Sequence, residues 1–139
     1  MQYKKNNNNY TICIEKGEKL LEILRDFAAK EGIKNGFFVG IGGASKAEIG
    51  FFDAKLKKYN IKKYEEPLEI VNITGNIAVM DEKQILHAHI TLGREDYGVI
   101  AGHLIEAVVF PVCEISLIKF DGEAERYLDE KTGLKSLRM

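Results

Sequence analysis

Apolar residues recur at two different periods along the chain, and the period changes near residue 36. Residues 17–31 carry one apolar stripe at spacings of three and four, which predicts an amphipathic helix. The stripe consists of Leu20, Leu21, Leu24, Phe27 and Ala28. Gly32 follows it and can end the helix. From residue 36 onward, short apolar or alternating runs separated by glycines and charged turns are typical of β-strands.

These runs predict about seven strands. We expect them at residues 10–14, 37–43 with 47–52 as a partner, 68–74, 76–80, 85–92, 99–109 and 112–120, with a short solvated strand pair or loop at 54–66. Pro111 cannot donate to a strand ladder and should mark an edge or a bulge. Strands do not alternate with helices, so the fold class is predicted to be α+β, a mainly antiparallel sheet with one main flanking helix.

The chain of 139 residues fits one domain, and 45% hydrophobic residues suffice for a core. The asparagine-rich residues 1–9 predict a disordered polar tail, which leaves 10–139 as a single domain. Apolar stretches are too short to cross a membrane, and no apolar signal segment follows Met1. We therefore expect a cytoplasmic protein in which Cys13 and Cys113 stay reduced.

Charge argues against a protein that binds duplex DNA on its own. The net charge is −1, whereas such proteins usually carry a basic excess. The distribution is uneven, because residues 1–64 hold 13 basic and 7 acidic side chains and residues 65–139 hold 7 and 14. A lysine patch with two interleaved tyrosines could be a nucleic-acid surface or a solvated face: Lys55, Lys57, Lys58, Lys62 and Lys63, with Tyr59 and Tyr64.

All three histidines lie between positions 87 and 103. His87 and His89 are two residues apart in a predicted strand, so their side chains share one face. His103 follows a short polar loop and could come from the neighbouring strand. Three imidazoles with an open fourth position are typical of a reactive or ligand-binding metal site, with zinc as the first candidate among zinc, nickel, copper and iron. The alternative is three ordinary half-buried histidines bonded to backbone carbonyls.

Other catalytic motifs are weaker. The glycine run from Gly40 to Gly43 lacks the spacing of a phosphate loop, and a strand follows it rather than a helix. No hydrolytic triad motif is present. A metal-dependent enzyme acting on a small substrate is a further possibility, with Glu95, Asp96 or Glu106 as the base. The segment from Leu104 to Phe110 is apolar on both strand faces, which favours either oligomer formation or burial within one subunit.

Several runs resemble those of the plant and prokaryote conserved (PPC) domain. They are Leu86-His87-Ala88-His89-Ile90-Thr91-Leu92-Gly93, Gly102-His103-Leu104-Ile105-Glu106, Asp129-Glu130-Lys131-Thr132-Gly133-Leu134, Gly40-Ile41-Gly42-Gly43-Ala44 and Ile73-Thr74-Gly75-Asn76. The resemblance extends from about Tyr10 to Leu137.

This resemblance implies an antiparallel sheet flanked by helices, a homotrimer and a metal site at His87, His89 and His103. A metal bound there could organise a small-ligand pocket between subunits. Plant members are fused to AT-hook motifs and act in transcription complexes, whereas prokaryotic members stand alone and are often labelled DNA-binding. The present chain has no Arg-Gly-Arg-Pro-like AT-hook core, and only Glu69-Ile70 of the plant partner-binding motif matches.

Overall fold

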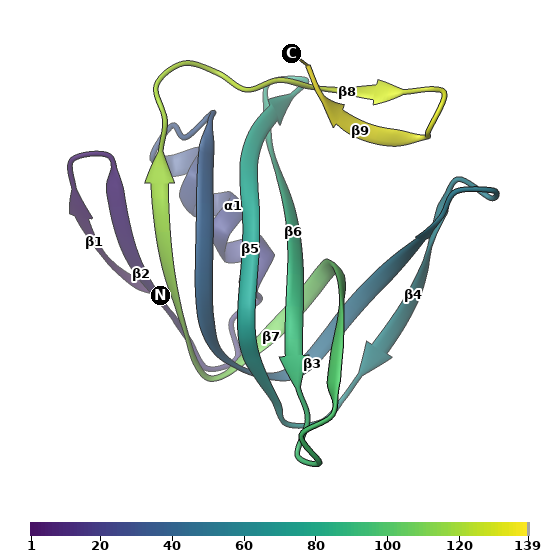
Figure 1. Ribbon diagram of the computed structural model, residues 1–139. Helices are drawn as coiled ribbons and strands as arrows, with labels where there is room; N and C mark the ends of the chain where they lie inside the picture. Colours follow the sequence, from purple (N-terminus) through teal and green to yellow (C-terminus); the bar gives the residue numbers. More distant parts are fainter. Residues whose placement is uncertain (139) are drawn as a thin grey trace.

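The computed structural model describes residues 1–138, which form one helix and nine strands. In chain order these are β1 (Gln2–Asn6), β2 (Asn9–Glu15), α1 (Leu20–Lys30), β3 (Gly36–Asp53), β4 (Lys58–Tyr64), β5 (Leu68–Met80), β6 (Lys83–Gly93), β7 (Val99–Lys119), β8 (Arg126–Asp129) and β9 (Leu134–Leu137). Seven strands form one antiparallel sheet, and β8 and β9 form a small hairpin (Figure 1). The predicted α+β fold class is confirmed.

Four long strands of the large sheet pair in a closed ring. The strand order is β1-β2-β7-β6-β5-β3-β4, and β3 also pairs with β7. The ring therefore runs from β3 through β5, β6 and β7 back to β3. The β1–β2 hairpin extends from β7, and β4 extends from the end of β3 (Figure 1). The ring gives the domain an inner face and an outer face.

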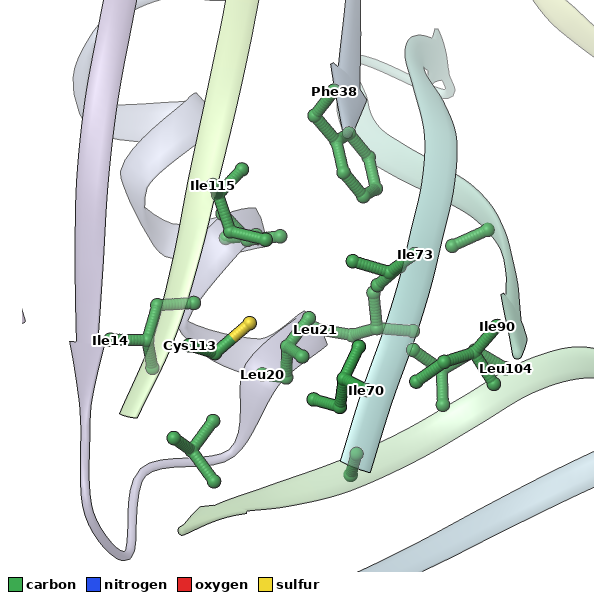
Figure 2. Close-up of a cluster of buried hydrophobic side chains, with 14 of the residues drawn as sticks. Ile14, Leu20, Leu21, Phe38, Ile70, Ile73, Ile90, Leu104, Cys113 and Ile115 are labelled. Atoms are coloured by element: carbon green, nitrogen blue, oxygen red, sulfur yellow. The ribbon is translucent and has the colours of Figure 1, made fainter. Parts of the chain in front are cut away.

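The core lies on the inner face of the sheet, where α1 covers it. The five predicted stripe residues of α1 are all buried, and the helix packs against β6 and β7. Figure 2 shows Leu20 and Leu21 in the same buried cluster as Ile70, Ile73 and Ile115 of the strands. Burial of an aliphatic side chain of this size stabilises the fold by ~1.5–3 kcal/mol. The helical prediction is therefore confirmed, with the start three residues later than predicted.

The strands are longer than the sequence predicted. Residues 37–43 and 47–52 were expected to pair with each other, but both belong to β3. Likewise, 68–74 and 76–80 are one strand, as are 99–109 and 112–120. Bulges allow this continuity in β3 and β7, and one of them contains Pro111, as predicted. At this bulge the β7 backbone comes so close that a Cβ on Gly43 would lie 2.2 Å from the carbonyl oxygen of Phe110.

The N-terminal prediction needs a correction. Residues 2–6, expected to be part of a disordered tail, form β1 and pair with β2. The turn between them uses Asn7 at a φ of 54°, a left-handed conformation that asparagine tolerates better than most residues. Tyr3 also packs edge-on against the ring of Phe27, with centroids 4.9 Å apart. The asparagine run is therefore a hairpin turn rather than the end of an unstructured segment.

The β8–β9 hairpin lies across one end of the sheet (Figure 1). It is attached to β5 through a bridge between Val79 and Glu125 and to the β3–β4 turn through a hydrogen bond from Lys57 Nζ to the carbonyl oxygen of Glu130, at 2.8 Å. No helix within residues 1–138 is long and apolar enough to cross a membrane.

Candidate metal centre

The three histidines meet on two neighbouring strands. His87 and His89 lie on β6 and His103 lies on β7, where His89 and His103 are direct cross-strand partners. The imidazole centroids are 5.1–5.5 Å apart. One nitrogen from each ring lies within 4.8 Å of the others, a grouping that could hold a metal ion. The expected convergence of the three side chains is therefore present.

Two of the three imidazoles are held in the neutral form. Burial lowers the pKa of His87, and the neighbouring Arg126 and His89 lower it further. Burial, with His87 and His89 nearby, lowers the pKa of His103 to about 4. Both rings are therefore uncharged at neutral pH and have a free lone pair, which metal coordination requires.

The alternative of ordinary structural histidines predicts bonds to backbone carbonyls. No such bond is made by any of the three rings, all of which lie in the described part of the chain. His103 Nδ1 is buried without a hydrogen-bond partner. A buried polar atom without a partner is destabilising, and here a metal ion could satisfy it.

Two side chains from other elements border the cluster. The ring of Tyr59, on β4, stacks on His103 with centroids 4.5 Å apart. Arg126, at the start of β8, places Nη2 3.5 Å from His87 Nδ1 and 2.7 Å from Asn76 Oδ1. Sequence analysis did not single out Arg126, because it lies far along the chain in a polar stretch without periodicity or motif.

The acidic residues considered as a general base lie elsewhere. The carboxylate of Glu106 accepts hydrogen bonds from the backbone N–H groups of Leu21 and Glu22, at 2.7 and 3.1 Å, so it caps α1. Glu95 and Asp96 lie in the turn between β6 and β7, six or more residues past His89. At ~3.3 Å per residue along the strand, that turn begins roughly 15 Å from the histidines.

The lysine patch lies on the β3–β4 hairpin, but several of its members have partners. Lys63 pairs with Glu48 at 2.8 Å, and Lys62 lies over the ring of Tyr64 at 5.1 Å. Tyr59 is half-buried against His103 and is not free to stack on a base. The patch thus offers no exposed pair of aromatic rings between its lysines.

Comparisons with known proteins agree with this fold. The Plants and Prokaryotes Conserved (PCC) domain family matches residues 1–121. A structure from Bacteroides thetaiotaomicron, described as a candidate DNA-binding protein, is 35% identical, covers 99% of this chain and 96% of its own, and has a TM-score of 0.96. A metal-containing protein from Archaeoglobus fulgidus is 32% identical, with coverages of 99% and 97% and a TM-score of 0.89.

A PPC protein from Pyrococcus horikoshii is also 32% identical, with coverages of 99% and 95% and a TM-score of 0.90. A search of curated proteins gives no match. The fold and the histidine cluster define a small α+β domain with a candidate metal-binding site. The chain belongs to the Plants and Prokaryotes Conserved (PCC, or PPC) domain family, which confirms the resemblance found in the sequence.

Proposed function

We propose that the protein binds a divalent metal ion, zinc in the first place, through His87, His89 and His103. The observation that carries the proposal is the convergence of three imidazole nitrogens within 4.8 Å on adjacent strands. Tetrahedral ligands with bonds of ~2.0–2.1 Å lie roughly 3.4 Å apart, so modest side-chain rotations would complete the site. The relative from Archaeoglobus fulgidus, named as metal-containing, supports the proposal.

Three histidines leave at least one coordination position open. A zinc ion held by three imidazoles can act as a Lewis acid toward an oxygen atom bound there. The chain would contribute the three imidazole ligands, and the ring of Tyr59 would cover the side of the metal site next to His103. A small-ligand pocket organised by the metal therefore belongs to the proposed function.

The protein is further proposed to work as a homotrimer. Apolar side chains lie exposed on the outer face of the sheet, where Phe37, Val39 and Ile41 of β3 are 38–57% exposed. Ile118 is the cross-strand partner of Phe37 and is 42% exposed. An apolar surface of this kind is typical of a contact between subunits.

Elemental analysis of untagged protein, purified without chelator, tests the metal site. Wild type should hold close to one zinc ion per chain, and His89→Ala should lose it. Thr91→Ala is the matched control, because Thr91 lies two residues further along β6, on the same face. Metal-free wild type would reject the site, and so would His89→Ala protein that keeps its metal. Solution mass of the same samples tests the trimer.

A DNA-binding role is the second candidate, because relatives from Bacteroides thetaiotaomicron and Ralstonia eutropha are described as candidate DNA-binding proteins. Lysines of the β3–β4 hairpin, such as Lys55 and Lys58, would supply the contacts. Binding of a short DNA duplex at low salt, with affinity that falls steeply as salt rises, would support this role. Absence of binding at low salt would reject it.

A further inference from the structure

A buried arginine lies beside the histidine cluster. Arg126 is only 8% exposed, and it is the one charged residue among the buried residues in the described part of the chain. Its Nη1 donates to the carbonyl oxygen of Lys135, and its Nη2 donates to Asn76 Oδ1 at 2.7 Å. Nη2 also lies 3.5 Å from His87 Nδ1. Asn76 and His87 are direct cross-strand partners, so the guanidinium is held against the cluster.

Within residues 1–138, the positive charge of Arg126 has no anionic partner. None of its hydrogen-bond partners there is a carboxylate, and burial lowers its pKa. Its Nε is buried without a hydrogen-bond partner among the described residues. Arg94 in the same protein behaves differently, because its Nε and Nη2 each donate to the carboxylate of Glu66 at 3.1 Å. Buried charges are normally paired, so Arg126 lacks the kind of partner that Arg94 has.

Metal binding would leave the guanidinium of Arg126 with even fewer hydrogen-bond acceptors. A neutral imidazole has one free lone pair, and a metal ion takes it; the other ring nitrogen then carries a proton. His87 could therefore no longer accept a hydrogen bond from Arg126. Three neutral imidazoles, a divalent ion and one guanidinium sum to a charge of about +3 in a partly buried place. An anion is the ligand that would satisfy both the charge and the free donors.

We propose that the open position of the metal takes a small oxyanion, a carboxylate or phosphate group, with one oxygen on the metal and another on Arg126. This inference rests on the proposed metal site. A planar guanidinium fork matches both kinds of group and holds them more specifically than an ammonium does. Tyr59 covers the side of the cluster at His103, and the β8–β9 hairpin supplies Arg126 at His87, so the bound group lies between these two elements.

Arg126→Gln and Arg126→Lys test the proposal, with Arg138→Gln as the matched control. Arg138 also belongs to the C-terminal hairpin region, but it is exposed and pairs with Glu125. Metal content is measured first, by elemental analysis of each protein loaded with zinc. Cobalt-substituted samples are then titrated with acetate and, separately, with inorganic phosphate, and the visible spectrum of the metal reports an anion in its coordination sphere.

Wild type and Arg138→Gln should bind one of the two anions with the same affinity. Arg126→Gln should keep its metal and bind that anion at least tenfold more weakly, and Arg126→Lys should lie between the two. The acetate and phosphate titrations show which group the site prefers. If Arg126→Gln does not fold, Arg126→Lys still tests the proposal, because it keeps the positive charge and loses the paired N–H donors of the guanidinium.

Metal-loaded wild type that binds neither anion overturns the inference, and so does an Arg126 variant that retains its metal and binds the anion as well as wild type. If the wild-type protein holds no metal in the first measurement, the proposed metal-binding function, on which this inference rests, is itself overturned. The two failures are therefore told apart before any anion is added.

Discussion

His89 and His103 lie directly opposite each other on β6 and β7, with ring centroids 5.5 Å apart. They are separated by 13 intervening residues that form the ends of two strands and one turn. This cross-strand relation turns a local His-x-His pair into a three-histidine cluster. The cluster depends on the register of β6 against β7, because a slip by one residue would move all the side chains of one strand to the other face.

The low pKa of His103 predicts that the metal-free protein loses stability in acid. Its ordinary value is 6.5 and its value in the folded protein is about 4, so the unfolded chain binds the proton more readily. Stability is therefore complete above pH 6.5 and falls as the pH drops toward 4. The difference sets an upper limit of ~3 kcal/mol, and solvent screening of a half-buried ring reduces the expected loss to ~1–2 kcal/mol.

Urea unfolding in the presence of a chelator, at several pH values between 7 and 4, measures this loss. His103→Asn should show a smaller decrease in the free energy of unfolding over the same range, and His87 accounts for part of what remains, since its pKa is also lowered. An equal decrease in both proteins would show that other groups cause the acid sensitivity.

Glu106→Gln should weaken the start of α1 and leave metal content unchanged. The Glu106 carboxylate accepts two backbone N–H groups at the helix N-terminus, where Lys19 provides no side-chain cap. Loss of its charge and of one good acceptor should cost ~1–2 kcal/mol of unfolding free energy. Thermal or urea unfolding beside Glu114→Gln, an exposed glutamate of the same strand, measures the effect. A loss of bound zinc in Glu106→Gln would instead connect this residue to the metal centre.

Gly75→Ala should destabilise the fold, because the new Cβ would lie 2.4 Å from Phe38 Cζ and 2.6 Å from the carbonyl oxygen of His87. Phe38 is fully buried and cannot move aside cheaply. Overpacking of this kind costs ~1–3 kcal/mol. Gly93→Ala on the next strand is the control, since its Cβ would meet nothing closer than 3.4 Å. Equal unfolding midpoints for the two variants would contradict the steric argument.

Val39→Lys should convert the proposed trimer into monomers without unfolding the chain. Val39 is 38% exposed at the centre of the outer apolar face, between Phe37 and Ile41, and a charge buried in a subunit contact is costly. Sedimentation or light scattering of the variant should give the mass of one chain. Leu56→Lys, at an exposed apolar position of the β3–β4 turn, should keep the mass of the wild type. A Val39→Lys trimer would place the contact on another face.

Local patterns predicted the parts of the fold that local physics decides. The stripe of α1 is set by the helical period, and the shared face of His87 and His89 is set by the strand period, so both could be predicted from the sequence. The predicted strand ends at glycines and at Pro111 were wrong. β-Bulges allow β3 and β7 to continue past residues that usually end a strand. The strand β1 was likewise not predicted, because the asparagine run that forms the turn at Asn7 is also typical of a disordered tail.

Arg126 shows what local patterns cannot provide. Its relation to His87 depends on the contact of β8 with the end of β5, and Arg126 and His87 themselves are 39 positions apart in the sequence. Neither its neighbours nor their spacing indicate burial, because most of the residues from 121 to 131 are charged and show no apolar periodicity. Only the three-dimensional arrangement identifies it as a buried charge without an anionic partner in the described part of the chain.

The pairing of β7 with β2, β3 and β6 also bears on how the chain folds during synthesis. Gly36 at the start of β3 is a partner of Lys119 at the end of β7, and Tyr10 of β2 is a partner of Leu117. The first strands therefore leave the ribosome long before their neighbour exists, and contacts so distant in sequence form slowly. We expect the domain to fold in one cooperative step, after nearly its whole length has emerged, with unpaired strand edges exposed until then.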